Sequence, residues 1–489
     1  MPWPKPLSSA LKNTLSKSIQ YGTEILHQRI PYSPDNPYLE GIFAPERQEH
    51  FSTNLKVEGQ IPAELDGALM RIGPNPITVK NPRNYHWFTG DGMLHALRLK
   101  GGEAHWYKSS YIGSASVQKK LHRPQIPGKT RGVADAVNTN VIHFAGKIWA
   151  LVEAGAYPVE LNAALESKRH HLFEDDQDFP FTAHPHIDPE TGDIHAICYD
   201  ALSQNKVFYL QIDSKGKLKH YVDIPVKHGP MIHDCAITRS HVLILDLNVN
   251  FSVRSALKGS MFPYQWNPKR QARMGILPFG GKAIDIRWYK IDPCFIFHTV
   301  NAYELDSGDV VMDAVVHSKA LVSSIQGPIE DQDIWLERFI FEQGTGKVAR
   351  TILSEMKQEF PRINEAYTGR PYRYVYTISF GEFDDPPHVS SNTLLSHDVE
   401  TGNSESYSFG ENWVTGDVIF VAREGAQAEN DGWLMSYVHA LDGRPSKVVI
   451  LDAQHMAEGP ITTIHLPIRV PVGFHCNWID YRKLRTHYS

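Results

Sequence analysis

From about residue 50 onward, short runs of apolar and β-branched residues alternate with polar segments. Such runs occupy residues 147–154, 193–201, 206–213, 241–249, 309–317 and 431–441. Runs of this length and composition are typical of β-strands. The pattern therefore predicts an all-β protein over most of the chain.

Glycine-bearing polar segments separate several of these runs, at residues 190–193, 213–217, 344–347 and 400–403. Glycine supplies the positive φ that tight hairpin turns require, so these segments predict antiparallel hairpins. Many hairpins along one chain favour a β-propeller, whose radial blades leave only short strand edges exposed. No repeat of fixed period marks the blades, and a pair of β-sandwiches is the alternative arrangement.

Helical spacing is confined to a few windows. In the segment from Ser8 to Ile30, the residues Leu11, Leu15 and Ile19 recur every four positions, which predicts an amphipathic helix. This helix either packs on the body of the protein or lies in a membrane surface. Two further windows, residues 159–168 and 354–358, are also expected to be helical. We expect residues 1–36 to form an amphipathic helical extension and residues 37–489 a single propeller domain.

Composition excludes several classes of protein. The chain has 489 residues, 42% of them hydrophobic and 21% charged, which is enough to build a large core. The net charge of −6 is unfavourable for binding nucleic acid. The four cysteines are too few and too scattered for a disulfide framework or a zinc–thiolate site. Without a long apolar run or a signal peptide, the cytoplasm is the expected compartment, with peripheral membrane contact through the N-terminal helix.

Histidine is abundant, at 25 residues. Four histidines stand in apolar, strand-like surroundings: His184 in Phe-Thr-Ala-His-Pro, His233 in Met-Ile-His-Asp, His298 in Phe-Ile-Phe-His, and His475 in Val-Gly-Phe-His-Cys-Asn-Trp. Their separations are far from the i, i+4 spacing of a helical metal site, but strands of successive blades could bring them to one axis. Spacing alone does not select these four residues from the rest.

Short motifs spread over most of the chain resemble those of the carotenoid cleavage oxygenase family, and they occur in the family's order. They are Asn-Pro-Tyr-Leu (36–39), Ile-Pro-Ala-Glu-Leu-Asp-Gly (61–67), Arg-Ile-Gly-Pro-Asn-Pro (71–76), Trp-Phe-Thr-Gly-Asp-Gly-Met (87–93), Asn-Thr-Asn (138–140), Thr-Ala-His-Pro (182–185), Ile-His-Asp (232–234), His298 with Asn301-Ala302, Glu-Phe-Pro (359–361), Gly-Arg-Pro-Tyr-Arg-Tyr (369–374), Asp-Gly-Trp (431–433) and Gly-Phe-His (473–475). Each motif is weakly specific, but the ordered set is strongly so.

The resemblance implies a seven-bladed propeller with a short helical and loop cap over iron(II) on its axis. It also implies that His184, His233, His298 and His475 bind the iron. Neutral imidazoles suit ferrous iron, and four of them leave coordination positions free for O₂ and substrate. The implied reaction is cleavage of one carbon–carbon double bond of a carotenoid or apocarotenoid by O₂, giving two carbonyl products.

The resemblance further assigns residues around the ligands. Glu153 and Glu359 match glutamates that hold the ligating histidines in orientation. The third such position carries Asp417, where the family usually has glutamate. Asp417 is one methylene shorter, so either the backbone moves in, a water bridges the gap, or the histidine is held more loosely. Thr139 matches a residue whose methyl group crowds the open iron position.

The substrate class that we expect depends on the residue immediately before Glu153. In stilbene-cleaving members a lysine immediately before the glutamate engages the substrate phenol, whereas this chain has Val152 before Glu153. The expected partners are therefore a polyene and O₂. A stilbene- or phenylpropene-cleaving dioxygenase and a non-catalytic propeller that binds no metal are the alternatives, and retinyl ester isomerisation is a further activity of the family. The oligomeric state is not predicted.

Overall fold

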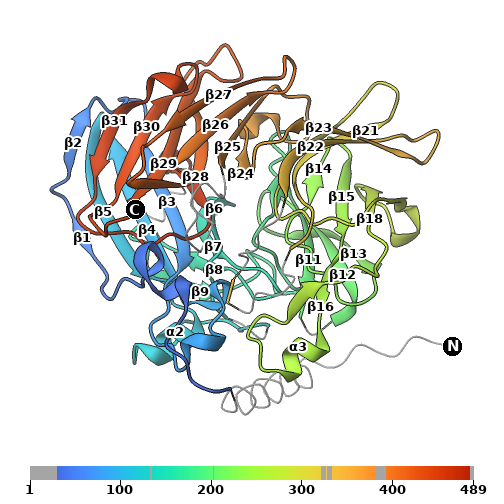
Figure 1. Cartoon of the computed structure of the whole chain (residues 1–489), viewed down its shortest axis with the longest axis horizontal. Coiled ribbons are helices and arrows are strands. Elements are labelled where there is room, and N and C mark those ends of the chain that lie inside the picture. Colours follow the sequence, from blue (N-terminus) through green and yellow to red (C-terminus); the bar gives the residue numbers. More distant parts are fainter. Residues whose placement is uncertain are drawn as a thin grey trace.

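The computed structural model describes residues 30–132, 135–201, 203–320, 326–327, 333–379 and 392–484. The strands form seven antiparallel sheets arranged as blades around one axis, together with a two-stranded sheet of β16 (Val249–Phe251) and β17 (Tyr264–Trp266). The predicted seven-bladed propeller is confirmed (Figure 1).

Five blades consist of four strands that follow one another around the ring. The first two are β6 (Asn140–Phe144), β7 (Lys147–Leu151), β8 (Val159–Leu161) and β9 (Ser167–His170), followed by β10 (His186–Ile187), β11 (Ile194–Asp200), β12 (Ser203–Ile212) and β13 (Leu218–Pro225). The third is β14 (Ala236–Ile237), β15 (His241–Asp246), β18 (Arg273–Pro278) and β19 (Arg287–Lys290). The next two are β20 (Thr299–Glu304), β21 (Val310–His317), β22 (Ile334–Phe341) and β23 (Val348–Ser354), then β24 (Gln358–Arg362), β25 (Tyr374–Ser379), β26 (Thr393–Asp398) and β27 (Asn403–Ser408).

The last two blades combine strands from both ends of the chain. The sixth blade is β28 (Trp413–Ala422), β29 (Gly432–Ala440), β30 (Lys447–Asp452) and β31 (Pro460–His465), with β2 (Lys56–Gly59) added at its outer edge. The seventh is β32 (Cys476–Asp480), β3 (Gly67–Pro74), β4 (Gly92–Lys100), β5 (Glu103–Tyr111) and β1 (Phe51–Ser52). Blue N-terminal strands therefore lie beside red C-terminal strands in Figure 1, and their pairing closes the ring.

Closure of the ring requires a close backbone approach. Strand β32 pairs with β3 from Gly67 opposite Asp480 to Arg71 opposite Cys476. Just beyond this ladder, a Cβ atom on Gly73 would lie 2.7 Å from the Cα of Gly473. Side chains do not fit at this distance, so both positions require glycine.

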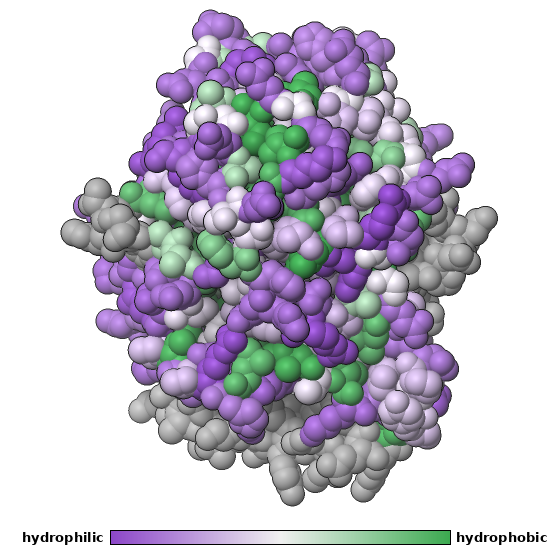
Figure 2. Space-filling model, turned by 90° about the vertical axis from the view of Figure 1, so that its left-hand side faces the viewer, coloured by the Kyte–Doolittle hydropathy of each residue, from purple (hydrophilic) through white to green (hydrophobic). Residues whose placement is uncertain are grey.

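The core lies mainly between the faces of neighbouring blades, where buried strands such as β21 and β29 have no exposed residue. The outer surface is mostly hydrophilic on the face drawn in Figure 2, where apolar side chains form small separate patches. Short helices lie near the cavity described below: α2 (Ala115–Lys120), α3 (Val253–Leu257), and the 3₁₀ turns η3 (Pro82–Asn84) and η4 (Trp87–Thr89). The other 3₁₀ turns are η1 (Pro37–Leu39), η2 (Gly41–Phe43), η5 (Ala283–Asp285), η6 (Glu365–Tyr367), η7 (Met456–Glu458) and η8 (Tyr481–Lys483).

The six apolar runs all contain strands, and the four glycine-bearing segments all lie between paired strands. The two internal helix predictions are wrong. Residues 159–168 form β8, a turn and the start of β9, and residues 354–358 connect β23 to β24. The predicted N-terminal helix lies outside the described residues, apart from Ile30. Among the described residues, no helix is both long and apolar enough to cross a membrane.

Candidate metal centre

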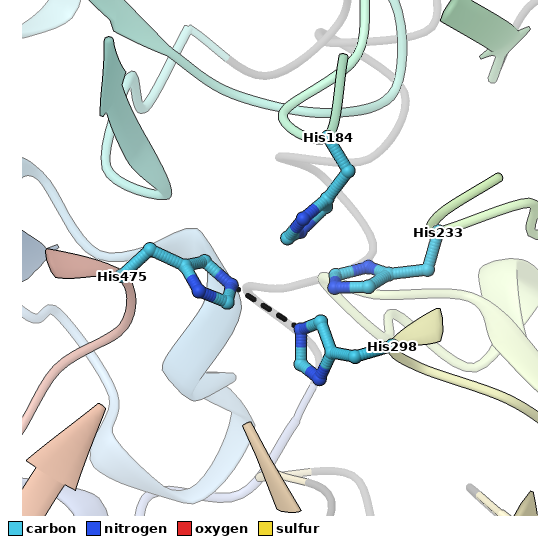
Figure 3. Close-up of side chains that lie close together, drawn as sticks. All are labelled: His184, His233, His298 and His475. Atoms are coloured by element: carbon cyan, nitrogen blue, oxygen red, sulfur yellow. Dashed lines mark hydrogen bonds between the residues drawn. The ribbon is translucent and has the colours of Figure 1, made fainter. Parts of the chain in front are cut away.

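Four histidines converge at the end of the ring where the innermost strands of four blades begin, and their side chains point toward one another (Figure 3). His184 precedes the inner strand β10, His233 precedes β14, His298 directly precedes β20, and His475 directly precedes β32. One ring nitrogen of each histidine lies within 4.8 Å of those of the other three. The Nε2 atoms of His298 and His475 are 3.2 Å apart. The residues expected to bind metal are thus brought together.

The other three blades also contribute to this end of the axis. Thr139 directly precedes the inner strand β6, Glu359 lies near the start of β24, and Asp417 lies within β28. Each of the seven innermost strands therefore places one of the predicted site residues at the same end of the ring. The remaining predicted residue, Glu153, follows β7.

Glu153 holds His233. The Oε2 atom of Glu153 lies 2.9 Å from Nδ1 of His233 and also accepts a hydrogen bond of 2.8 Å from the hydroxyl of Tyr199. All three side chains are buried. A carboxylate accepts a hydrogen bond from Nδ1–H, so Nδ1 keeps its proton and the lone pair of His233 is on Nε2.

Glu359 holds His298 at a shorter distance than Glu153 holds His233. Its Oε2 lies 2.6 Å from Nδ1 of His298 and its Oε1 lies 2.8 Å from Nε2 of His317. Burial alone would lower the pKa of His298, but the charge of Glu359 and its hydrogen bond outweigh burial and raise that pKa. Conversely, burial would raise the pKa of Glu359, and the two histidines lower it.

Asp417 reaches His475 directly but over a longer distance. Its Oδ2 lies 3.3 Å from Nδ1 of His475 and accepts a hydrogen bond of 3.0 Å from the backbone nitrogen of Cys476. The register of β28 shifts between Thr415 and Val418, so a β-bulge carries the aspartate. Burial lowers the pKa of His475 to about 4 in spite of Asp417. Asp417 is a buried strand residue and not a turn residue.

His184 differs from the other three histidines. Among the described residues no carboxylate contacts its ring, and its buried Nε2 has no hydrogen-bond partner. Burial, together with the other three histidines, lowers its pKa well below the usual range, so the ring is neutral. An unpartnered buried nitrogen is costly unless something binds it.

The four rings fit a single metal ion. Metal–imidazole bonds are about 2.1 Å long, so adjacent ligand nitrogens lie about 3 Å apart, as the Nε2 atoms of His298 and His475 do. Three Nδ1 atoms are engaged by carboxylates, which is the usual way in which proteins orient histidine ligands. The unpartnered Nε2 of His184 then gains a partner as well.

A large cavity reaches the histidine group. Its volume is 1220 Å³, and it is lined by Thr139 and Glu153 as well as by aromatic residues, among them Trp87, Phe88, Phe262, Phe297, Phe360 and Phe474. The hydroxyl of Thr139 donates to Oδ1 of Asn138, at 2.9 Å. Residues of α2, α3 and η4 also line the cavity, which agrees with the expected cap of short helices and loops.

Backbone strain accompanies both glutamates. Ala154, directly after Glu153, has a φ of 61°, and Phe360, directly after Glu359, has a φ of 54°. Residues other than glycine, asparagine and aspartate rarely adopt such values, and strain of this kind concentrates at functional sites. Phe360 also stacks on His298, with ring centroids 5.2 Å apart.

Two residues of the site were missed in the sequence. His317 shares Glu359 with His298, and Tyr199 shares Glu153 with His233. His317 ends an apolar strand and so matches the criterion that selected the four histidines, which could have identified it. Tyr199 lies in an ordinary strand pattern that gives no signal.

Comparisons of the sequence and of the structure with known proteins agree with one another, and each covers most of the chain. Residues 43–480 match the family described as retinal pigment epithelial membrane protein. A carotenoid cleavage oxygenase of Mycobacterium tuberculosis is 35% identical, over 91% of this chain and 97% of its own. Two solved structures, each 26% identical, are a lignostilbene dioxygenase of Pseudomonas brassicacearum (TM-score 0.80, covering 92% of this chain and 99% of that one) and a cobalt-substituted Synechocystis ACO (TM-score 0.79, 91% and 99%).

Proposed function

The chain belongs to the carotenoid cleavage oxygenase family, and we propose on that basis that it is an iron(II) dioxygenase that cleaves a carbon–carbon double bond of a carotenoid or apocarotenoid. The observation that carries the proposal is the junction of four converging histidines with a large, aromatic-lined cavity. In this reaction the double bond is broken and each oxygen atom of O₂ enters one of two carbonyl products. The reaction therefore needs no external reductant.

We propose His184, His233, His298 and His475 as the iron ligands. Ferrous iron supplies the redox chemistry that allows O₂ to react with an alkene. Four neutral ligands keep the full charge of the metal and leave coordination positions free. Glu153, Glu359 and Asp417 hold the Nδ1 atoms of three ligands, so that the opposite nitrogens point to one place.

The protein's further contribution is placement of the substrate. An apolar cavity binds a polyene by excluding water, and rigid walls fix which double bond lies beside the histidines. Thr139 lines the cavity, and we propose that its methyl group limits access to the open side of the metal. No acid or base is required, because both product oxygens come from O₂.

The test is a direct assay of metal and products. Purified protein should contain about one iron, and aerobic incubation with β-carotene and β-apocarotenals should give products whose masses identify the cleaved bond. The His298→Ala variant should lose both iron and turnover. His105→Ala is the matched control, because His105 is exposed on β5, away from the four-histidine group. A His298→Ala protein that keeps its iron and full activity would contradict the assignment.

A stilbene or phenylpropene is the second candidate substrate, favoured by the similarity to the lignostilbene dioxygenase structure. Against it, Val152 is apolar and lines the cavity, so it gives no charged contact to a phenol. Incubation with resveratrol and isoeugenol distinguishes this candidate from a carotenoid substrate, since cleavage of either compound gives an aromatic aldehyde. A non-catalytic propeller is the remaining alternative, and it predicts protein without iron.

Contact with a membrane surface is part of the same proposal. Carotenoids reside in bilayers, and the sequence of residues 8–30 has the spacing of an interfacial helix. Sedimentation of the full chain with phospholipid vesicles, compared with a Leu15→Asp variant, tests this contact.

A further inference from the structure

A buried arginine that forms no direct ion pair lies close to the metal centre. Arg71 of β3 is 1% exposed, and among the described residues no carboxylate forms an ion pair with it. Its Nη1 donates to the carbonyl of Pro471 at 2.7 Å, whereas Nε and Nη2 have no hydrogen-bond partner. A buried guanidinium with two unpartnered nitrogens is costly, so its surroundings point to a bound group.

A buried histidine faces the same region. His439 of β29 is fully buried, and its Nδ1 lies 2.8 Å from the carbonyl oxygen of Val470. A carbonyl accepts only, so Nδ1 carries the proton and Nε2 is a lone pair that requires a donor. That Nε2 has no partner among the described residues. Burial also lowers the pKa of His439 well below its usual range, which keeps the ring neutral.

Two glycines show where these atoms meet. A Cβ atom on Gly416 would lie 3.6 Å from both Nε of Arg71 and Nε2 of His439. A Cβ atom on Gly473 would lie 3.1 Å from Nη2 of Arg71. The unpartnered atoms of Arg71 and His439 are thus neighbours of Gly416, where no side chain intervenes. Asp417 follows Gly416, and its buried Oδ1 also has no partner. The charge of Asp417 acts on Arg71, where it opposes the lowering of the pKa of the guanidinium by burial.

We propose that Arg71, His439 and Asp417 bind a structural water beside Gly416. The water accepts from Nε or Nη2 of Arg71 and donates to Nε2 of His439 and Oδ1 of Asp417. Water fits because the site offers both donors and acceptors that lack partners. A small anion such as chloride would satisfy Arg71 but would face the lone pair of His439 and the carboxylate of Asp417.

This water gives Arg71 and His439 a positioning role. Asp417 contacts His475 at 3.3 Å, a longer distance than either glutamate contact. Fixing the second oxygen of Asp417 stops the carboxylate from rotating away from His475. Arg71 and His439 therefore act on the metal site through Asp417. This role rests on the proposed function, because it takes His475 as a metal ligand.

A crystal structure of the full chain tests the site itself. We expect a density peak about 2.7–3.2 Å from Arg71, Nε2 of His439 and Oδ1 of Asp417. Crystals soaked in bromide should show no anomalous signal at this place. A site without density, or one that binds bromide, would overturn the proposal.

The Gly416→Ala variant tests the positioning role. Its methyl group makes ordinary contacts with Arg71 and His439 and occupies the place of the water without removing a polar group. Gly344→Ala is the matched control, because a Cβ there meets nothing within 4 Å. We expect Gly416→Ala to lose the density peak, to alter the visible absorption of the cobalt(II)-substituted protein and to weaken cobalt(II) binding about tenfold. The control should change none of these.

An Arg71→Gln variant provides an independent readout. It keeps a polar side chain but removes the charge, and its cobalt(II) spectrum should shift in the same direction as that of Gly416→Ala. Unchanged spectra and affinities in both variants would overturn the positioning role. These measurements need no turnover, so a protein that binds metal and this water but cleaves no polyene would contradict the proposed function alone.

Discussion

The histidine group has two unequal halves. His233 and His298 are held by glutamates at 2.9 and 2.6 Å, and each glutamate has a further side-chain partner, Tyr199 or His317. His475 is held by an aspartate at 3.3 Å, and His184 contacts no carboxylate of the described chain. The difference teaches that convergence of ligands and rigidity of ligands are separate properties. The arrangement of the blades makes the ligands converge, and the buried carboxylates make them rigid.

The largest expected effect is on the acid stability of the apoprotein. The pKa of His475 is lowered from 6.5 to about 4, so its contribution to stability is present above pH 6.5 and is lost as pH falls towards 4. The shift corresponds to about 3 kcal/mol. The pKa of His298 is raised, so its contribution is present below pH 6.5 and is lost as pH rises through the raised value.

Urea unfolding of metal-free variants at several pH values checks this contrast. His475→Gln should lose less stability than the parent chain between pH 7 and pH 5, whereas His298→Gln should lose more. If the free energy of unfolding depended on pH equally in the two variants, the electrostatic difference between His475 and His298 would be contradicted.

The next effect concerns the tightly held half. Glu359→Gln removes the charge that His298 and His317 share, and it should weaken metal binding about 100-fold. Equilibrium dialysis against cobalt(II) measures the affinity, with Glu304→Gln as a control. Glu304 is a partly exposed glutamate at the opposite end of β20 from His298, where it pairs with His241 of β15 in the neighbouring blade. Affinity equal to that of the control would show that the glutamate does not orient its ligand.

A smaller effect is expected in the loosely held half. Asp417→Asn should weaken cobalt(II) binding about tenfold, since the contact to His475 is already long. Measured in the same dialysis, a loss larger than that of Glu359→Gln would reverse the order of the two halves.

The smallest effect tests the strain beside a glutamate. Ala154 has a φ of 61°, which glycine adopts without cost, so Ala154→Gly should stabilise the protein by up to about 1 kcal/mol. Thermal unfolding of the metal-free protein measures the change. A destabilised variant would mean that the methyl group of Ala154 contributes more by packing than its backbone costs.

Local patterns predict the strands and hairpins well, because period-two apolar runs and glycine turns act over a few residues. The same patterns mislead at residues 159–168, where Leu161 and Leu165 have helix-like spacing but Leu165 takes a φ of 62° in a turn between two strands. The pairing of β32 with β3 joins residues about 400 positions apart, and no local signal encodes it.

The site depended on the resemblance and not on spacing. The motifs selected four histidines that the structure brings together, and they selected Glu153, Glu359 and Asp417 beside them. They did not reveal His317, because its role depends on sharing Glu359 across two blades. How Asp417 reaches His475 also required the structure, since a β-bulge determines it.

The most direct test of the central claim is the isotopic composition of the products. Iron-loaded protein is incubated with the best polyene substrate under ¹⁸O₂, and the products are analysed at once by mass spectrometry. Our account predicts two carbonyl fragments that together contain all carbons of the substrate, each carrying one ¹⁸O. Intact or isomerised polyene, or fragments without ¹⁸O at early times, would contradict it.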